Sequence, residues 1–428
     1  MSGRVLERVK GQLRTLGLSG LVRRARNRLT GGTAAAQPGA RPGAPAGGRP
    51  RDRIVVSLAP DEPPAGSVLL SYIIDPFLLG PDEPLPSRHT HYWESWQIAR
   101  TFLDLGYAVD VISWRNTEFV LRKDYAFFVD VRHNLERIAP LLNPDCVKIF
   151  HSDTAHMLFQ NAAESRRLLE LQQRRGVTLQ PRRFEMPNLA IEHADCAIIK
   201  GNEFTLGTYR YAGKPLYPIW GTPVAHYPWP EDKDFDACRR NFLFLSSGGM
   251  VHKGLDLVLE VFAALPDYHL TVCGPVDREK GFEDAFRREL YETPNIHTHG
   301  WVDVDGPEFT DIARRCAGLV YPSCSEGQSG GVITCLHAGL IPIISVESGV
   351  DVRDDFGVLL KTSSLPEIRA AVERVAALPA ETLRSMARSS WEVARAGYTR
   401  EMFAANFKAA VCSIMAARGQ SSGRCANG

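Results

Sequence analysis

Residues 321–339 combine an acid with a cluster of glycines, in a pattern typical of a strand, a turn and a helix. After the apolar strand, Glu326 enters a turn that contains Gly327, Gly330 and Gly331. Glycines let a ligand approach backbone N–H groups closely, and a helix N-terminus favours a negatively charged group. The segment therefore predicts a site for an anion or a polyhydroxyl ligand beside a carboxylate. A glycine-rich turn that serves packing alone is the alternative.

Two further turns carry similar chemistry. An expected strand over residues 241–246 runs into Ser247-Gly-Gly-Met-Val-His-Lys-Gly254, where a glycine-loosened turn precedes the cation Lys253. A lysine there can neutralise a phosphate or diphosphate, or it can be a surface residue in the first turn of a helix. Another expected strand, over residues 268–273, ends in Gly274. The three turns together favour a nucleotide site more than any one of them does.

The first half of the chain offers three histidines and an amide as candidates. His89 and His91 precede the first long expected helix, while His151 and Asn202 each follow an apolar strand. An imidazole in such a place can bind a hydroxyl group or share its proton. We take His151 as a candidate catalytic residue and the other three as candidates for binding an acceptor. A structural hydrogen bond to a neighbouring loop is the alternative role.

Composition limits the class of protein. The chain has 428 residues, of which 44% are hydrophobic and 23% charged, and this is typical of a globular protein with two or three domains. A formal net charge of +1 gives no overall attraction to nucleic acid. The nine cysteines form no C-x-x-C pair, so we expect buried, reduced thiols in a cytoplasmic protein. No apolar run approaches the length of about 20 residues that a membrane span needs.

The start of the chain differs from the rest. Residues 1–30 carry eight Lys or Arg side chains against the single acid Glu7, and their apolar residues recur near helical spacing. Such an arm could lie on the anionic inner face of a membrane, or it could be a solvated basic segment. Residues 31–52 consist mainly of Gly, Ala, Pro and Arg, which predicts a linker before a folded body that begins near Arg53.

From Arg53 onward, short apolar runs alternate with longer amphipathic segments, which is typical of α/β architecture with parallel sheets. A proline-dense connection over residues 220–230 separates two such series. We therefore expect two Rossmann-like, doubly wound domains, over residues 53–230 and 231–400, that face each other across a cleft. Residues 401–418 are expected to form a terminal helix, and residues 419–428 to be disordered.

Four motifs of the second series stand in order: Phe242-Leu-Phe-Leu-Ser-Ser-Gly-Gly-Met-Val-His-Lys-Gly-Leu-Asp-Leu-Val-Leu-Glu260, Leu270-Thr-Val-Cys-Gly274, Asn295-Ile-His-Thr-His-Gly300 and Pro322-Ser-Cys-Ser-Glu-Gly327. In order and spacing they resemble the donor-binding half of the retaining glycosyltransferases of family 4. These are two-domain enzymes of GT-B architecture that take a sugar from a nucleotide diphosphate. The first half of the chain resembles the family more loosely. The resemblance also implies that the terminal helix crosses back to the first domain.

The resemblance implies roles for individual residues. Lys253 would contact the donor diphosphate beside the turn at Gly248 and Gly249, and Glu326 would hold the sugar hydroxyls. His151 stands where related enzymes often carry a histidine that lines the cleft. The other candidates for binding the donor are Gly274, Gly327, Gln328, Ser329, Gly330, Gly331 and Thr334.

Two positions depart from the family pattern. The family usually has an arginine where this chain has Gly248, and a second glutamate, which holds the ribose, where it has Thr334. Each loss removes a charge-assisted hydrogen bond worth roughly 1.5 to 3 kcal/mol. Thr334 retains a hydroxyl that can accept and donate one hydrogen bond.

These observations predict an enzyme that moves a hexose-type sugar from a nucleotide diphosphate donor to a carbohydrate, lipid-linked or small-molecule acceptor. The cleft-facing turns contain no Asp-x-Asp pair, and the resemblance implies no metal and no further cofactor. A nucleotide-sugar epimerase or hydrolase on the same architecture is one alternative. A catalytically degenerate scaffold that binds sugar or nucleotide is the other, and it rests on Gly248 and Thr334.

Overall fold

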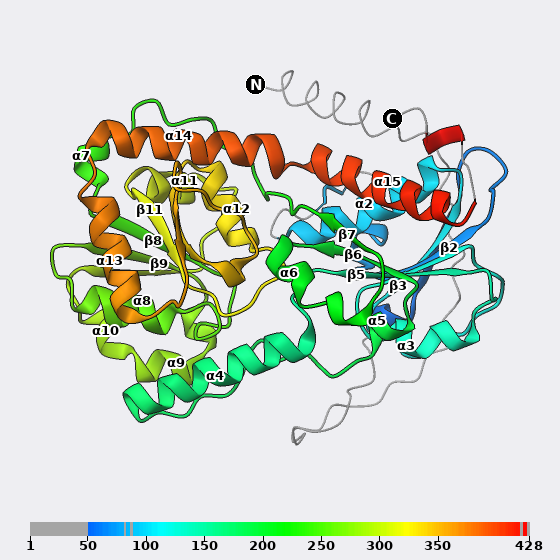
Figure 1. Ribbon diagram of the computed structural model, residues 1–428, viewed down its shortest axis with the longest axis horizontal. Coiled ribbons are helices and arrows are strands. Elements are labelled where there is room, and N and C mark those ends of the chain that lie inside the picture. Colours follow the sequence, from blue (N-terminus) through cyan, green and yellow to red (C-terminus); the bar gives the residue numbers. More distant parts are fainter. Residues whose placement is uncertain (1–49, 81–82, 86–88, 420–422, 426–428) are drawn as a thin grey trace.

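The computed structural model describes residues 50–80, 83–85, 89–419 and 423–425. Two lobes lie side by side, and each is built on a central sheet covered by helices (Figure 1). This confirms the expected α/β fold with two parallel-sheet domains. The basic arm over residues 1–30, with the membrane contact predicted for it, lies outside the described residues.

The first lobe contains a seven-stranded sheet in the order β1-β3-β2-β4-β5-β6-β7. Its strands are β1 Val55–Leu58, β2 Ser67–Tyr72, β3 Ala108–Ser113, β4 Phe127–Asp130, β5 Val147–Ser152, β6 Cys196–Lys200 and β7 Leu216–Ile219. Strand β1 pairs antiparallel with β3, and all other neighbours are parallel. Helices of this lobe are α2 Thr90–Asp104, α3 Asn134–Ile138, α4 Met157–Arg175, α5 Ala190–His193 and α6 Glu203–Gly207.

The second lobe contains a six-stranded parallel sheet in the order β10-β9-β8-β11-β12-β13. Its strands are β8 Asn241–Leu245, β9 His269–Cys273, β10 Ile296–Gly300, β11 Gly318–Tyr321, β12 Ile341–Ser345 and β13 Val358–Leu360. The direction in which the chain adds strands reverses between β8 and β11. In open α/β sheets, ligands bind outside the carboxyl ends of the strands at such a switch point.

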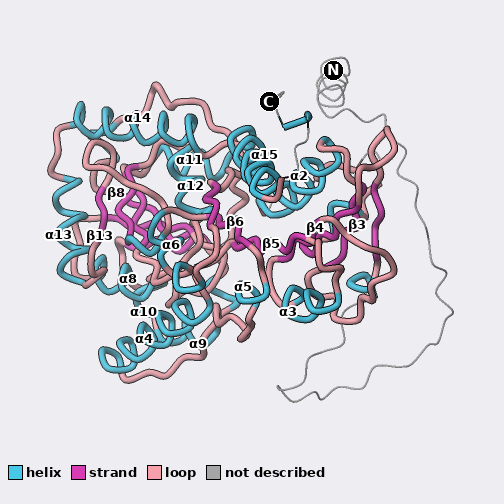
Figure 2. Tube along the Cα trace, turned by 45° about the vertical axis from the view of Figure 1, so that its right-hand side comes forward, coloured by secondary structure: helices cyan, strands magenta, loops and turns pink. Residues whose placement is uncertain are grey.

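Helices cover both faces of the second sheet. They are α7 Phe235–Cys238, α8 Leu255–Ala263, α9 Lys280–Ala285, α10 Arg287–Tyr291, α11 Pro307–Arg314, α12 Gly330–His337, α13 Leu365–Ala376 and α14 Ala380–Gly397. The last helix, α15 Arg400–Ala417, leaves this lobe and lies beside α2 of the first lobe (Figures 1 and 2). There it buries Phe403 and Phe407 completely in the core of the first lobe.

Helix α4 joins the lobes on the opposite side, beneath α9 and α10 in Figure 1. Near its carboxyl end, Arg174 Nη2 lies 2.6 Å from Asp256 Oδ2 on α8. Arg175 Nη1 lies 2.7 Å from Glu289 Oε1 on α10. The two lobes are therefore held together by α4 on one side and by α14 and α15 on the other.

Both ends of the described chain differ from expectation. A 3-10 helix spans Pro50–Arg53, and the buried Asp52 accepts a hydrogen bond from Ser113 at 2.9 Å. The end of the expected linker therefore belongs to the folded body. At the other end, Gly423–Cys425 forms a short 3-10 helix within the tail that was expected to be disordered.

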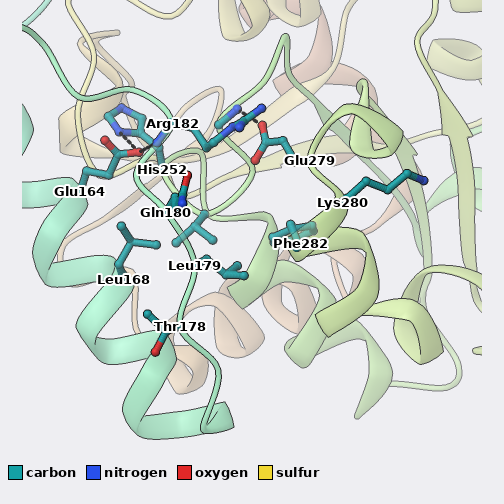
Figure 3. A pocket seen from close by; sticks show the side chains of 13 residues that line it. Glu164, Leu168, Thr178, Leu179, Gln180, Arg182, His252, Glu279, Lys280 and Phe282 are labelled. Atoms are coloured by element: carbon teal, nitrogen blue, oxygen red, sulfur yellow. Dashed lines mark hydrogen bonds and ion pairs between the residues drawn. The ribbon is translucent and has the colours of Figure 1, made fainter. Parts of the chain in front are cut away.

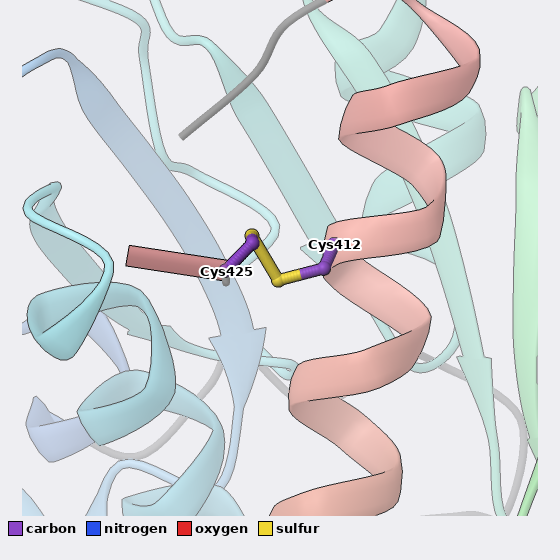
Figure 4. Close-up of a disulfide and its surroundings, with 2 residues drawn as sticks. All are labelled: Cys412 and Cys425. Atoms are coloured by element: carbon purple, nitrogen blue, oxygen red, sulfur yellow. A yellow bond between two sulfur atoms is a disulfide. The ribbon is translucent and has the colours of Figure 1, made fainter. Parts of the chain in front are cut away.

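A disulfide ties this carboxyl-terminal segment to α15. It joins Cys412 of α15 to Cys425 (Figure 4). The other seven cysteines are free and buried, as expected. The expectation that every thiol is reduced is therefore wrong for these two residues. In the described ranges, no helix is long and apolar enough to cross a membrane.

Candidate functional site

Lys253 and Glu326 meet at the switch point of the second sheet. Lys253 lies in the turn between β8 and α8, and Glu326 in the turn between β11 and α12. The Lys253 ammonium pairs directly with Glu326 Oε1, which also accepts hydrogen bonds at 2.9 Å from the hydroxyls of Tyr321 and Ser323. The sequence indicated that both residues belong to one site, but not that each would be the other's partner.

The ionisation of Glu326 follows from these contacts. Burial alone would raise the pKa of the Glu326 carboxyl, but Lys253, His252 and Arg183 outweigh it and lower the pKa to about 2. Burial lowers the pKa of Lys253, and the charge of Glu326 opposes that shift. The side chains of Lys253 and Glu326 are only 5% and 11% exposed. The site thus holds an ionised carboxylate and its cation almost out of contact with water.

The glycine-rich turn before Lys253 already binds an anionic group. Gly248 and Gly249 have φ angles of 143° and 79°, which residues with a Cβ rarely adopt. The N–H groups of Gly249 and Met250 donate to the carboxylate of Glu279, at 3.2 Å for Met250. The amides of this turn therefore hold a negative charge, and the chain itself supplies it.

A cavity of about 280 Å³ opens beside Gly249, between the two lobes. Glu164 and Leu168 of α4 face Glu279 and Phe282 of the second lobe across it (Figure 3). Its wall combines apolar side chains with carboxylates and an imidazole. The sequence did not predict this cavity, because the segment that follows α4 has no periodic pattern.

The loop after Glu326 brings the lobes into contact. The carbonyl of Gly327 accepts a hydrogen bond from the Thr205 hydroxyl at 2.7 Å. A Cβ at Gly327 would lie 2.2 Å from the carbonyl oxygen of Asp153, so only glycine allows this approach. Gln328 Oε1 accepts from the Gly221 N–H at 2.5 Å. Gly327 and Gln328 therefore bind the first lobe in this structure.

The remaining donor-side candidates have structural roles. Ser329 caps the N-terminus of α12, which begins with Gly330 and Gly331. The N–H of Gly274 donates to the Gly300 carbonyl at 2.7 Å. The buried Thr334 donates its hydroxyl to the Gly330 carbonyl at 2.8 Å. Thr334 therefore retains only acceptor capacity for a ligand hydroxyl.

A cluster of buried charges faces this loop from the first lobe. Lys200 Nζ lies 2.9 Å from Glu94 Oε2 and 2.8 Å from His91 Nε2. His91 Nδ1 lies 3.3 Å from Asp153 Oδ2, and Arg132 also pairs with Asp153. Burial, followed by Lys200, lowers the pKa of His91 to about 3, so its imidazole is neutral at pH 7.

Sequence reasoning missed Glu94, Asp153 and Lys200. Asp153 stands two residues after His151, and Lys200 ends a buried strand, so the position of each gives a weak indication that it could belong to a site. Glu94 carries none. His89, which the sequence did indicate, is exposed and caps the N-terminus of α2.

Two first-lobe candidates, His151 and Asn202, make hydrogen bonds within the protein. His151 does not line the cleft, because its ring is fully buried and its Nδ1 lies 3.0 Å from the Ile198 carbonyl oxygen. It faces Tyr72 and Phe407 rather than the second lobe. Asn202 caps α6, and its Nδ2 donates to Asp351 of the second lobe at 2.8 Å.

Comparisons with known proteins find matches in fold among solved structures. No protein-family model and no curated protein matches the sequence. Sucrose-phosphate synthase from Thermosynechococcus elongatus matches with a TM-score of 0.56 at 15% identity, over 82% of this chain and 99% of that one. HepE from Anabaena, solved with UDP and glucose, matches with a TM-score of 0.51 at 11% identity, over 82% of this chain and 99% of that one. This chain has the GT-B fold.

A third GT-B protein, TarM from S. aureus, matches with a TM-score of 0.47 at 12% identity. That match covers 66% of this chain and 54% of TarM, so the chain spans about half the length of TarM. Identities this low show the fold alone. In the part of the chain that the structure describes, no group of three or more His, Cys, Asp or Glu side chains is arranged to hold a metal ion.

Proposed function

We propose that this chain is a retaining glycosyltransferase that moves a sugar from a nucleotide diphosphate to an acceptor. The observation that carries the proposal is the meeting of the Lys253 ammonium and the Glu326 carboxylate at the switch point of the second sheet. HepE, which shares the fold, was solved with UDP and glucose. That likeness supports a nucleotide sugar as the donor.

The two charges suit the two ends of the reacting bond. Cleavage of a sugar–phosphate bond develops positive charge at the anomeric carbon and negative charge on the leaving oxygen. Lys253 and the N–H groups of the glycine-rich turn would stabilise the leaving diphosphate. Glu326 would bind the hydroxyls of the sugar and orient it. No metal is needed in this scheme, because the chain supplies the positive charge itself.

Donor binding requires a rearrangement of this closed site. Lys253 and Glu326 contact each other, and the lobes touch at Gly327. A sugar can reach both side chains only if their contact opens and the lobes move apart. Domain closure around a ligand is a common means of excluding water from such a reaction.

The first-lobe cluster would form the acceptor side. His91 and Lys200 lie in it, and Asp153 contacts the Glu326 loop through its backbone. A neutral imidazole beside a carboxylate can accept or relay the proton of an acceptor hydroxyl.

We further propose that the enzyme works in the cytoplasm, with residues 1–30 as a peripheral contact to an anionic membrane.

The test is a donor screen with product analysis. The purified chain is incubated with UDP-, GDP- and ADP-sugars, with and without pooled carbohydrate and lipid-linked acceptors. The proposal predicts that nucleoside diphosphate is released faster when an acceptor is present, and that NMR finds the anomeric configuration of the donor in the product. Conversion of the donor without an acceptor would favour an epimerase or hydrolase. Binding of a donor without turnover would favour the scaffold.

A further inference from the structure

The charges around the glycine-rich turn are almost fully compensated within the chain. Lys253 is paired with Glu326, and the N–H groups of Gly249 and Met250 are occupied by Glu279. A diphosphate that enters this turn brings several negative charges. These charges require a cation that is not already neutralised by a carboxylate.

Arg183 stands over this turn. It lies in the segment between α4 and α5, and a Cβ added to Gly249 would meet its Cγ at 2.5 Å and its Cδ at 3.0 Å. The backbone of Arg183 is held in place, because its N–H donates to both oxygens of Glu164, at 2.9 and 3.2 Å. Its carbonyl accepts from Gln160 Nε2 at 2.6 Å. The backbone of Arg183 is thus held by hydrogen bonds, and its side chain passes across the turn.

The charge of Arg183 acts on both sides of the cleft. It helps to lower the pKa of Glu326 and, after the effects of burial and Glu326, that of Lys253. It also contributes, after burial and other charges, to the lowered pKa of His89 in the first lobe. The side chain of Arg183 is exposed, and no carboxylate of the described residues lies within ion-pair distance of its guanidinium.

We propose that Arg183 binds the diphosphate of the donor from the first lobe, together with Lys253 and the amides of the glycine-rich turn. This inference rests on the proposed function. A guanidinium can donate two parallel hydrogen bonds to phosphate oxygens, which an ammonium cannot match in geometry. Gly249 leaves room for the arginine stem, so the cation comes from the opposite lobe instead of from the turn itself. A bound diphosphate would then link the two lobes.

The test is calorimetric titration of the full chain with UDP, GDP and ADP, and with the corresponding nucleosides. Arg183→Ala should weaken nucleoside diphosphate binding about ten- to hundredfold and leave nucleoside binding unchanged. The diphosphate affinity of Arg183→Lys should lie between those of the wild type and Arg183→Ala, because lysine keeps the charge but loses the paired hydrogen bonds. The matched control is Arg166→Ala, which changes an exposed arginine of α4 outside the lining of the cavity beside Gly249, and it should bind as the wild type does.

The outcomes separate this inference from the proposed function. If the wild type binds a nucleoside diphosphate and Arg183→Ala binds it equally well, the inference is wrong while the function stands. If the wild type binds none of the three diphosphates, both fail. Equal weakening of nucleoside and diphosphate binding would also contradict the inference, because it would show general damage to the site. Because the Arg183 side chain is exposed, the melting temperature of Arg183→Ala should equal that of the wild type.

Discussion

The ammonium of Lys253 and the carboxylate of Glu326 are direct partners although 73 residues separate them in the chain. They come together because β8 and β11 are neighbours in the sheet, and each residue follows one of these strands. The pair therefore lies where a doubly wound sheet places its ligand. In this structure each charge neutralises the other, so the site is assembled but closed.

The pair should make stability depend on pH in a defined window. The ordinary pKa of a glutamate is 4.5, and burial of Glu326 is outweighed by Lys253, His252 and Arg183, which lower its pKa to about 2. The ionised carboxylate thus contributes stability above pH 4.5 that is lost as the pH falls toward 2. Urea denaturation should find Glu326→Gln less stable by up to about 3 kcal/mol at pH 7 and 5. This difference in the free energy of unfolding should shrink at pH 3.5. A difference that stays constant with pH would contradict the lowered pKa of Glu326.

Glu279 should compete with the diphosphate for the turn amides. Its carboxylate holds the N–H groups of Gly249 and Met250, so removal of its charge should favour an incoming anion. Glu279→Gln keeps the shape and should tighten nucleoside diphosphate binding about three- to tenfold. Calorimetric titration with UDP, GDP and ADP measures the change.

The matched control for this experiment is Glu283→Gln. Glu283 is a nearby carboxylate on α9 with its own partners, Lys280 and Tyr291. Its replacement should leave diphosphate affinity unchanged. If Glu279→Gln weakens binding instead, Glu279 supports the turn rather than competing for it.

A second carboxylate opposite Asp351 should weaken the contact between the lobes. Asn202 Nδ2 donates to Asp351 Oδ1 at 2.8 Å across the lobes. Asn202→Asp sets two carboxylates opposite each other while aspartate still caps α6, so the closed arrangement should weaken. Small-angle X-ray scattering should find a larger radius of gyration for this variant. Addition of Asp351→Asn should restore the wild-type value, and failure to restore it would show that the hydrogen bond does not hold the lobes.

Transfer should not depend on a metal ion. Under the proposed function, Lys253 and the N–H groups of the turn would supply the positive charge that a divalent cation supplies in other sites. The rate of nucleoside diphosphate release should therefore be the same in excess EDTA as in untreated buffer. Loss of activity in EDTA that is restored by Mg²⁺ or Mn²⁺ would contradict this expectation.

Much of the fold follows from the sequence because parallel strands and helices have distinct periods. The sequence predicts the second lobe as an α/β series, since its buried strands alternate with amphipathic helices. Strands β4, β7 and β13 give only weak signals in the sequence. Strand β4 is a run of only four residues, while β13 has three and lies at a sheet edge. Strand β7 contains Pro218 and is also an edge strand, where proline is tolerated.

The site was only partly predictable for a similar reason. Lys253 and Glu326 stand in glycine-rich turns that local spacing marks as unusual. Glu94 and Lys200 are 106 residues apart and meet only through the packing of α2 against the sheet, so no local pattern indicates them. Arg183 lies in an irregular segment, and its place over Gly249 depends on how α4 crosses to the second lobe.

The most direct test of this site is the rate of donor cleavage when Lys253 and Glu326 are replaced. With the donor that the screen identifies, kcat/KM is measured for the wild type, Lys253→Ala, Glu326→Ala and the double variant. Each single change should lower kcat/KM by at least about a hundredfold, and the double change should lower it by less than the product of the two factors. The controls are Lys361→Ala, which changes an exposed residue, and Glu373→Ala, which changes a partly exposed one, and both variants should retain the wild-type rate. Wild-type rates for Lys253→Ala and Glu326→Ala would show that this pair takes no part in donor cleavage.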